Sequence, residues 1–143
     1  MRAMSPPLES NLKGNQKCGG WRATQHARAQ VLQWATEQPN FPPLISLDFD
    51  NQLVDNAIPR LQSLMTKHEI DVVAFRDTSG YLNFGQVMWR NTPIVAHVAQ
   101  MIAENTLHTW DQAALSHAIA VAEEDGHLQC ATATRAAFSE YVC

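Results

Sequence analysis

Two extended runs separated by a short turn constrain this sequence more than any other feature. Residues 71–75 and 81–88 are rich in β-branched, aromatic and other apolar residues, a composition typical of strands. The turn between them ends in Gly80, and glycine readily adopts the positive φ that a short loop with a bulge requires. The sequence therefore predicts a β-hairpin, and any fold of the chain has to include a sheet.

A third strand and a helix precede this hairpin. Residues 45–49 alternate apolar and polar side chains, the period-two pattern of a half-buried strand, and this strand should end near Asp50. The next segment, 55–67, has apolar residues along one helical face, with Asp55 placed to cap the helix and Pro59 in its first turn. A strand, a helix and a strand make a βαβ unit, whose right-handed crossover places the first two strands parallel.

Helical periodicity appears again in the sequence both before and after the predicted strands. One helix is expected over residues 21–39, where apolar residues recur at helical spacing up to a proline. Another should begin at 91–93, where a capping side chain precedes proline. A third is expected between the capping-box residues 109–112 and Gly126, and a last one over about 133–141.

These elements predict one α+β domain over residues 21–143, in the order αβαββααα. About five helices would cover a small three-stranded mixed sheet, made of the βαβ unit and the hairpin. Residues 1–20 are rich in Pro, Gly and polar side chains, a composition that buries too little apolar surface to offset its ordering entropy. We expect this segment to be a mobile N-terminal arm.

The net charge of −4 is unevenly distributed. Residues 1–28 hold five basic residues against Glu9, a balance of +4, which leaves −8 for the remainder. The folded body is therefore not expected to bind nucleic acid, because that affinity comes largely from neutralising phosphates. The basic arm either tethers the protein to nucleic acid or an acidic partner, or is a solvated extension, and we favour the second interpretation because its charges are dispersed.

Several cellular contexts are excluded on composition. No window approaches the roughly 18 to 20 apolar residues of a membrane span, and residues 5–20 lack the apolar stretch of a secretory signal. The three cysteines are odd in number and far apart, so no disulfide framework is predicted. We expect a soluble, cytoplasmic protein with no membrane association.

Two aspartates at the end of the first predicted strand form the most specific local pattern. Asp48 and Asp50 follow an apolar run, and open parallel sheets bind ligands beyond the carboxyl ends of their strands. Two carboxylates there could hold Mg²⁺ or present a nucleophile to a phosphoryl group. The second strand would end beside them, so Asp77 and Ser79 join Asp48 and Asp50 as candidate ligand-binding residues.

This stretch is similar to the first motif of the haloacid dehalogenase-like phosphohydrolases. The resemblance covers about a dozen residues and implies that Asp48 is the nucleophile and Asp50 the acid/base of a Mg²⁺-dependent reaction. Asn51 and Gln52 stand where that family usually has Gly and Thr or Val. The alternative is a strand end whose carboxylates face water or cap the next helix.

The aromatic residues suggest where a partner could bind. Most are expected in the core, whereas Trp21 and Trp110 flank helix starts and are the candidate interface residues. Because no complete catalytic set is evident, the sequence favours a non-enzymatic binding or accessory module without a cofactor. It would act on an unknown protein partner or through self-association as a homodimer. The alternative is a small Mg²⁺-dependent phosphoryl-transfer or hydrolase-like enzyme using Asp48 and Asp50.

Overall fold

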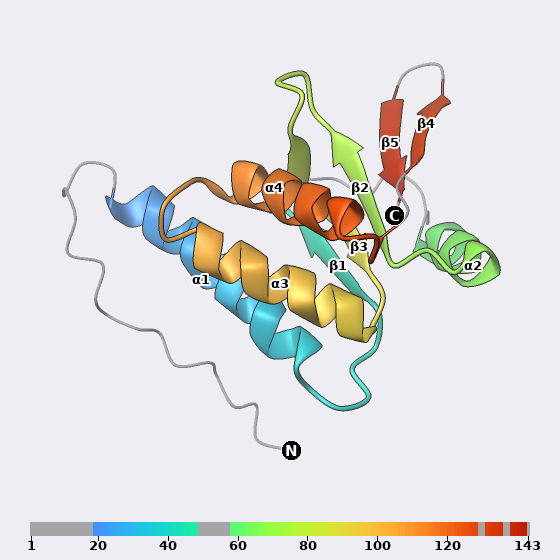
Figure 1. Ribbon diagram of the computed structural model, residues 1–143, viewed down its shortest axis with the longest axis horizontal. Helices are drawn as coiled ribbons and strands as arrows, with labels where there is room; N and C mark the ends of the chain where they lie inside the picture. Colours follow the sequence, from blue (N-terminus) through green and yellow to red (C-terminus); the bar gives the residue numbers. More distant parts are fainter. Residues whose placement is uncertain (1–18, 49–57, 129–130, 136–137, 143) are drawn as a thin grey trace.

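The computed structural model describes residues 19–48, 58–128, 131–135 and 138–142 (Figure 1). Its elements are α1 (Gly19–Thr36), β1 (Leu44–Leu47), α2 (Ile58–His68), β2 (Val72–Arg76), β3 (Leu82–Trp89), α3 (Pro93–Asn105), α4 (Asp111–Glu124), β4 (Ala131–Arg135) and β5 (Phe138–Val142). The predicted α+β class is confirmed. None of the helices in these segments is long and apolar enough to cross a bilayer.

The strands form one sheet in the order β1-β3-β2-β5-β4, and every neighbouring pair is antiparallel. Strands β1 and β2 both run antiparallel to β3, so they point the same way, as the crossover rule predicts. However, β3 lies between them and hydrogen-bonds to both. The sheet is therefore antiparallel throughout, whereas the sequence predicted a mixed sheet.

The prediction of a helix over residues 133–141 is wrong, because the described residues of this segment belong to β4 and β5, which pair antiparallel. Strand β5 pairs with β2, placing Val142 opposite Val73 and Glu140 opposite Phe75. An unpaired β2 edge offers a row of backbone donors and acceptors, and such tertiary pairing overrides weak local periodicity. In the described segments the sheet has five strands and the helices number four.

Helices cover both faces of the sheet. On one face α1, α3 and α4 lie together, and α2 lies on the other (Figure 1). The larger core fills the three-helix side, and its biggest fully buried side chains include Phe84, Trp89, Ile102 and Leu115. The smaller core joins Met65 of α2 to Val73 and Met88. Alternating side chains of β2 and β3 therefore enter opposite cores, as the pleat of a strand requires.

Local turn and helix-start signals hold at several positions. Gly80 has a φ of 88° in the β2–β3 turn, and Gly126 has a φ of 72° just after α4. Pro93 is the first residue of α3, as expected. The Thr92 hydroxyl, however, donates to Asp71 Oδ1 at 3.1 Å instead of capping the helix.

Other boundaries differ from the sequence prediction. Helix α4 begins at Asp111 with Trp110 as its N-cap residue, so the predicted capping box over 109–112 does not form. Gly19 and Gly20, assigned to the arm, are the first residues of α1. The rest of the predicted arm, together with Asp55, lies outside the described residues.

Candidate functional site

A cavity of about 530 Å³ lies where the N-terminal parts of α1 and α4 meet the end of β1 and the middle of β3. This volume falls in the range of roughly 300 to 1,000 Å³ that is usual for small-ligand sites. The lining combines aromatic and aliphatic side chains with a few charged and amide groups. The lining residues are Trp21, Thr24, Gln25, Arg28, Leu47, Asp48, Phe84, Gly85, Trp110, Asp111 and Gln112.

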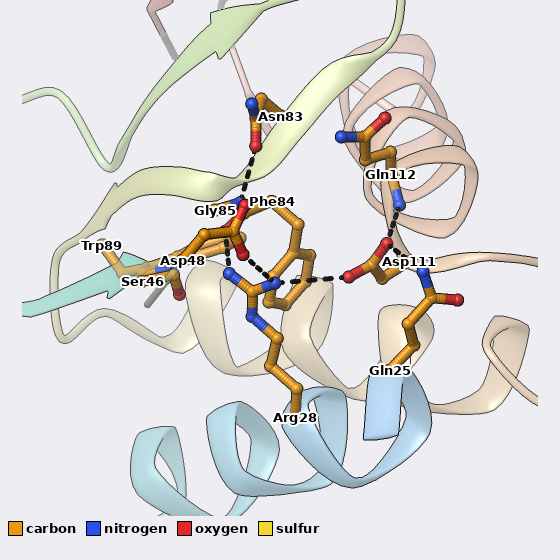
Figure 2. A network of polar contacts seen from close by, with 10 residues as sticks. All are labelled: Gln25, Arg28, Ser46, Asp48, Asn83, Phe84, Gly85, Trp89, Asp111 and Gln112. Carbon is orange, nitrogen blue, oxygen red and sulfur yellow. Dashed lines mark hydrogen bonds and ion pairs between the residues drawn. The ribbon is translucent and has the colours of Figure 1, made fainter. Parts of the chain in front are cut away.

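Arg28 of α1 is the centre of the polar network in this cavity (Figure 2). Its Nη1 lies 2.7 Å from Asp48 Oδ1 and 3.5 Å from Asp111 Oδ2. Its Nη2 donates to the Phe84 carbonyl at 3.1 Å, and its guanidinium carbon lies 4.7 Å from the centroid of the Phe84 ring. One side chain thus links α1 to β1, β3 and α4, and both of its terminal nitrogens are engaged.

Asp111 is the buried carboxylate of the network, at 5% exposure. Its Oδ1 accepts hydrogen bonds from Gln25 Nε2 at 3.0 Å and from the Gln112 amide at 2.9 Å. Burial raises the pKa of Asp111, while the Arg28 charge and the Gln112 amide act in the opposite direction. As the first residue of α4, Asp111 also lies where a helix N-terminus favours negative charge.

Asp48 is held against the backbone of β3. Its amide donates to the Gly85 carbonyl at 3.0 Å, which continues the ladder one residue beyond β1. A Cβ atom at position 85 would overlap the Asp48 carboxylate. Gly85 is therefore required for this close approach, and it leaves the Asp48 side chain 39% exposed beside Arg28.

Gln25 lies one helical turn before Arg28 and lines the same cavity. Its amide nitrogen donates to Asp111, whereas its Oε1 is buried without a hydrogen-bond partner in the described part of the chain. The residue as a whole is 8% exposed. A buried acceptor without a partner is uncommon in folded proteins.

The two predicted interface residues both line this cavity. Trp21 lies at the start of α1 and is 61% exposed, the largest value among the large hydrophobic residues of the described segments. Trp110 precedes α4 and packs edge-on against Tyr81, with the ring centroids 5.1 Å apart. The cavity therefore has indole rings in its lining from two separate helix starts.

The four candidate ligand-binding residues do not gather in one place among the described residues. Asp48 lines the cavity, and Asp50 lies outside the described residues. Asp77 and Ser79 are in the β2–β3 turn, where the Asp77 carboxylate accepts from both the amide and the hydroxyl of Ser79. Neither of these two lines the cavity.

The antiparallel sheet explains this separation. Asp48 bonds to Gly85, whereas Asp77 bonds to Tyr81, four residues further along the β3 side of the hairpin. At about 3.3 Å per residue, four residues span roughly 13 Å along a strand. The parallel-sheet argument, in which neighbouring strand ends share one site, therefore does not apply here.

A metal site is not supported by the described side chains. No group of three or more His, Cys, Asp or Glu residues within the described ranges could hold a metal ion. The two carboxylates of the cavity lie on either side of the Arg28 guanidinium, so a cationic side chain occupies the position that a bridging Mg²⁺ would need. This donor set does not fit Mg²⁺, which prefers an octahedron of oxygen ligands.

Sequence reasoning found one of the network's charged residues and missed the others. Arg28 and Gln25 continue the buried stripe of α1, since Ala29 and Leu32 follow them at helical spacing and are buried. Polar residues on an otherwise apolar stripe are the signal that could have identified them. Asp111 belongs to the predicted helix start over residues 109–112, and no local sequence signal marks it as a site residue.

Comparison of the chain with known protein families, with curated proteins and with solved structures found no match.

Proposed function

We propose that this domain is a non-enzymatic binding module and that the cavity around Arg28 is its binding site. The observation that carries the proposal is the organisation of the cavity. Four elements contribute to it, aromatic residues line it, and its charged side chains are bound to one another. Such a concave, mostly apolar site with a few fixed polar groups is the usual form of a ligand pocket.

The alternative of a Mg²⁺-dependent phosphoryl-transfer or hydrolase-like enzyme has less support. A nucleophilic Asp48 would need a carboxylate oxygen directed at the substrate, with a metal and an acid/base beside it. Instead Oδ1 of Asp48 is 2.7 Å from Arg28, and the neighbouring acid is buried at the start of α4. These contacts favour Asp48 as a counter-ion of the binding site.

A protein partner is the favoured kind of ligand because large apolar side chains surround the cavity. Trp21, Leu47 and Tyr81 are exposed, and either line the cavity or contact a lining residue. Clustered exposed apolar side chains are typical of interaction surfaces. Strand β1 is also an edge strand of the sheet that the described residues form, four residues long, where another chain could pair. A second copy of this chain is one such partner.

The test is a fragment screen followed by amide chemical-shift mapping on ¹⁵N-labelled protein. The proposal expects fragments that shift the amides of Gln25, Gly85 and Asp111 together. Fragments that shift only distant amides, or no binding at all, would refute the proposed site.

The same sample tests the enzymatic alternative with Mg²⁺ and p-nitrophenyl phosphate. The proposal expects no hydrolysis above the buffer rate. Turnover that is lost on Asp48→Asn and kept in Asp125→Asn, an exposed aspartate at the far end of α4, would favour the enzyme instead.

A further inference from the structure

We infer that the cavity recognises an organic cation, namely a protonated alkylamine or a guanidinium group carried on an apolar stem. The inference rests on the proposed function and names the ligand chemistry of that site. It follows from the charge balance of the cavity, from the engagement of Arg28 and from the nature of the remaining lining.

The charges of the lining residues are unbalanced. Arg28 is the cation among them, and Asp48 and Asp111 are both acids that share its guanidinium. Asp111 is enclosed by Gln25 and Gln112, whereas the Asp48 carboxylate stays 39% exposed. A ligand entering the cavity therefore meets the open side of Asp48, which attracts a second cation.

An anionic ligand would be poorly accommodated. The Arg28 guanidinium contacts two carboxylates and the Phe84 carbonyl, and it stacks on the Phe84 ring. A carboxylate or phosphate would either displace one of these partners or bind the remaining N–H donors of Arg28, and in both cases it would lie beside at least one of the two acids. Like charges at such distances repel by several kcal/mol when they are partly removed from water.

The uncharged part of the lining suits the stem and the head of an organic cation. Indole faces attract ammonium and guanidinium groups, and Trp21 and Trp110 both line the cavity. Leu47 offers apolar contact for an aliphatic stem. Gln25 also lines the cavity, and its amide nitrogen holds Asp111 in place at 3.0 Å.

Two sources could supply this chemistry, a lysine or arginine side chain of a protein partner or a free amine. The probes are the peptide acetyl-Gly-Lys-Gly-amide, the same peptide with Nε-acetyl-lysine, the same peptide with glutamate, and n-pentylamine, each titrated into ¹⁵N-labelled protein. We expect lysine peptide or pentylamine to shift the amides of Asp48, Gly85 and Asp111. The acetylated and glutamate peptides should bind at least tenfold more weakly.

The relative affinities of these probes distinguish a partner side chain from a free amine. They also distinguish a failure of the cation inference from a failure of the proposed binding site. Tighter binding of the peptide than of pentylamine would indicate a partner side chain, and the reverse would indicate a free amine. If the neutral or acidic peptide binds as well as the lysine peptide, or if only neutral fragments bind, the cation inference is wrong and the binding site stands. If neither probes nor fragments bind in the cavity, the proposed function itself fails.

Variants test whether the Asp48 carboxylate is responsible for cation binding. Asp48→Asn should weaken cation binding at least tenfold, because it removes the exposed charge while keeping the side-chain shape. Asp125→Asn removes the same charge at the opposite end of α4 and should leave the affinity unchanged. Trp21→Leu replaces an exposed aromatic side chain of the lining and should also weaken binding. Unchanged affinity in Asp48→Asn would overturn the inference.

Discussion

Replacing Arg28 by Met should destabilise the domain through the carboxylate it leaves behind. Met keeps an unbranched apolar stem of similar length, so the loss of charge dominates. The Asp111 side chain is 7% exposed and would then have no cationic partner among the residues that line the cavity. Asp48 is more exposed and can be solvated by water, so it should contribute little.

The expected loss follows from the contacts. Breaking a fully buried ion pair from one side costs about 3 to 5 kcal/mol. The Arg28 side chain is 27% exposed and lies 3.5 Å from Asp111 Oδ2, so we take a value below that range, about 2 kcal/mol. Losing the hydrogen bond to the Phe84 carbonyl adds about 1 kcal/mol. We therefore expect a total loss of about 3 kcal/mol in the free energy of unfolding.

Urea unfolding at pH 7, followed by circular dichroism, measures this loss. A double-mutant cycle with Asp111→Asn separates its parts, because Asn keeps an oxygen that can accept from Gln25 and Gln112. In that background Arg28→Met should cost only about 1 kcal/mol, the share of the Phe84 hydrogen bond.

The pH dependence gives an independent check. Burial raises the pKa of Asp111 above its unfolded value of 3.8. A raised carboxyl pKa means that the folded state holds its proton more tightly, so this contribution to stability is complete below pH 3.8 and is lost as pH rises through the folded pKa. Arg28→Met removes a charge that lowers this pKa. The loss of unfolding free energy in the Arg28→Met variant, relative to the unmodified protein, should therefore shrink as the pH falls towards 4 and Asp111 is protonated. A deficit below 1 kcal/mol at pH 7, or one independent of both pH and Asp111, would refute the reasoning.

Three further predictions concern the same region and the assembly. Gly85→Ala places a methyl group where the Asp48 carboxylate lies, so it should separate Asp48 from Arg28, weaken cation binding and cost about 1 to 3 kcal/mol in urea unfolding. Ser46→Ala removes the hydroxyl that accepts from the buried Trp89 indole N–H at 3.0 Å, and should lower the free energy of unfolding by about 1 to 3 kcal/mol. In a Trp89→Phe background, which lacks that N–H, Ser46→Ala should lower it clearly less. Sedimentation velocity should detect a homodimer at high protein concentration, and a strict monomer would contradict self-association.

Elements set by local chemistry were predictable from the sequence. The β2–β3 hairpin needs a residue of positive φ at its turn, and Gly80 supplies it. Helix α3 begins where proline can occupy the first turn, and α4 ends before a glycine of positive φ. Each of these signals acts within a few residues, so one segment of sequence contains the whole physical cause.

Elements that depend on distant partners were not predictable in this way. Strand β5 owes its pairing to β2, more than 60 residues earlier in the chain. The segment 131–142 contains alanines and aromatic residues that also suit a helix, and the open edge of β2 decides between the two structures. The position of β3 between β1 and β2 is likewise a choice of pairing that a hydrophobic pattern leaves undetermined.

The site shows the same division between local and distant causes. A few residues are enough to predict a strand that ends in an aspartate, and this pattern made Asp48 a candidate ligand-binding residue. In the structure Asp48 lines the cavity. Whether that carboxylate acts as a nucleophile or as a counter-ion depends on what the fold places beside it. Here Gly85 of β3 leaves room for the Asp48 carboxylate to pack against the strand, and Arg28 of α1 supplies the guanidinium that pairs with it. The motif fixes the chemical group, and the antiparallel neighbour and the covering helix favour a binding role for it.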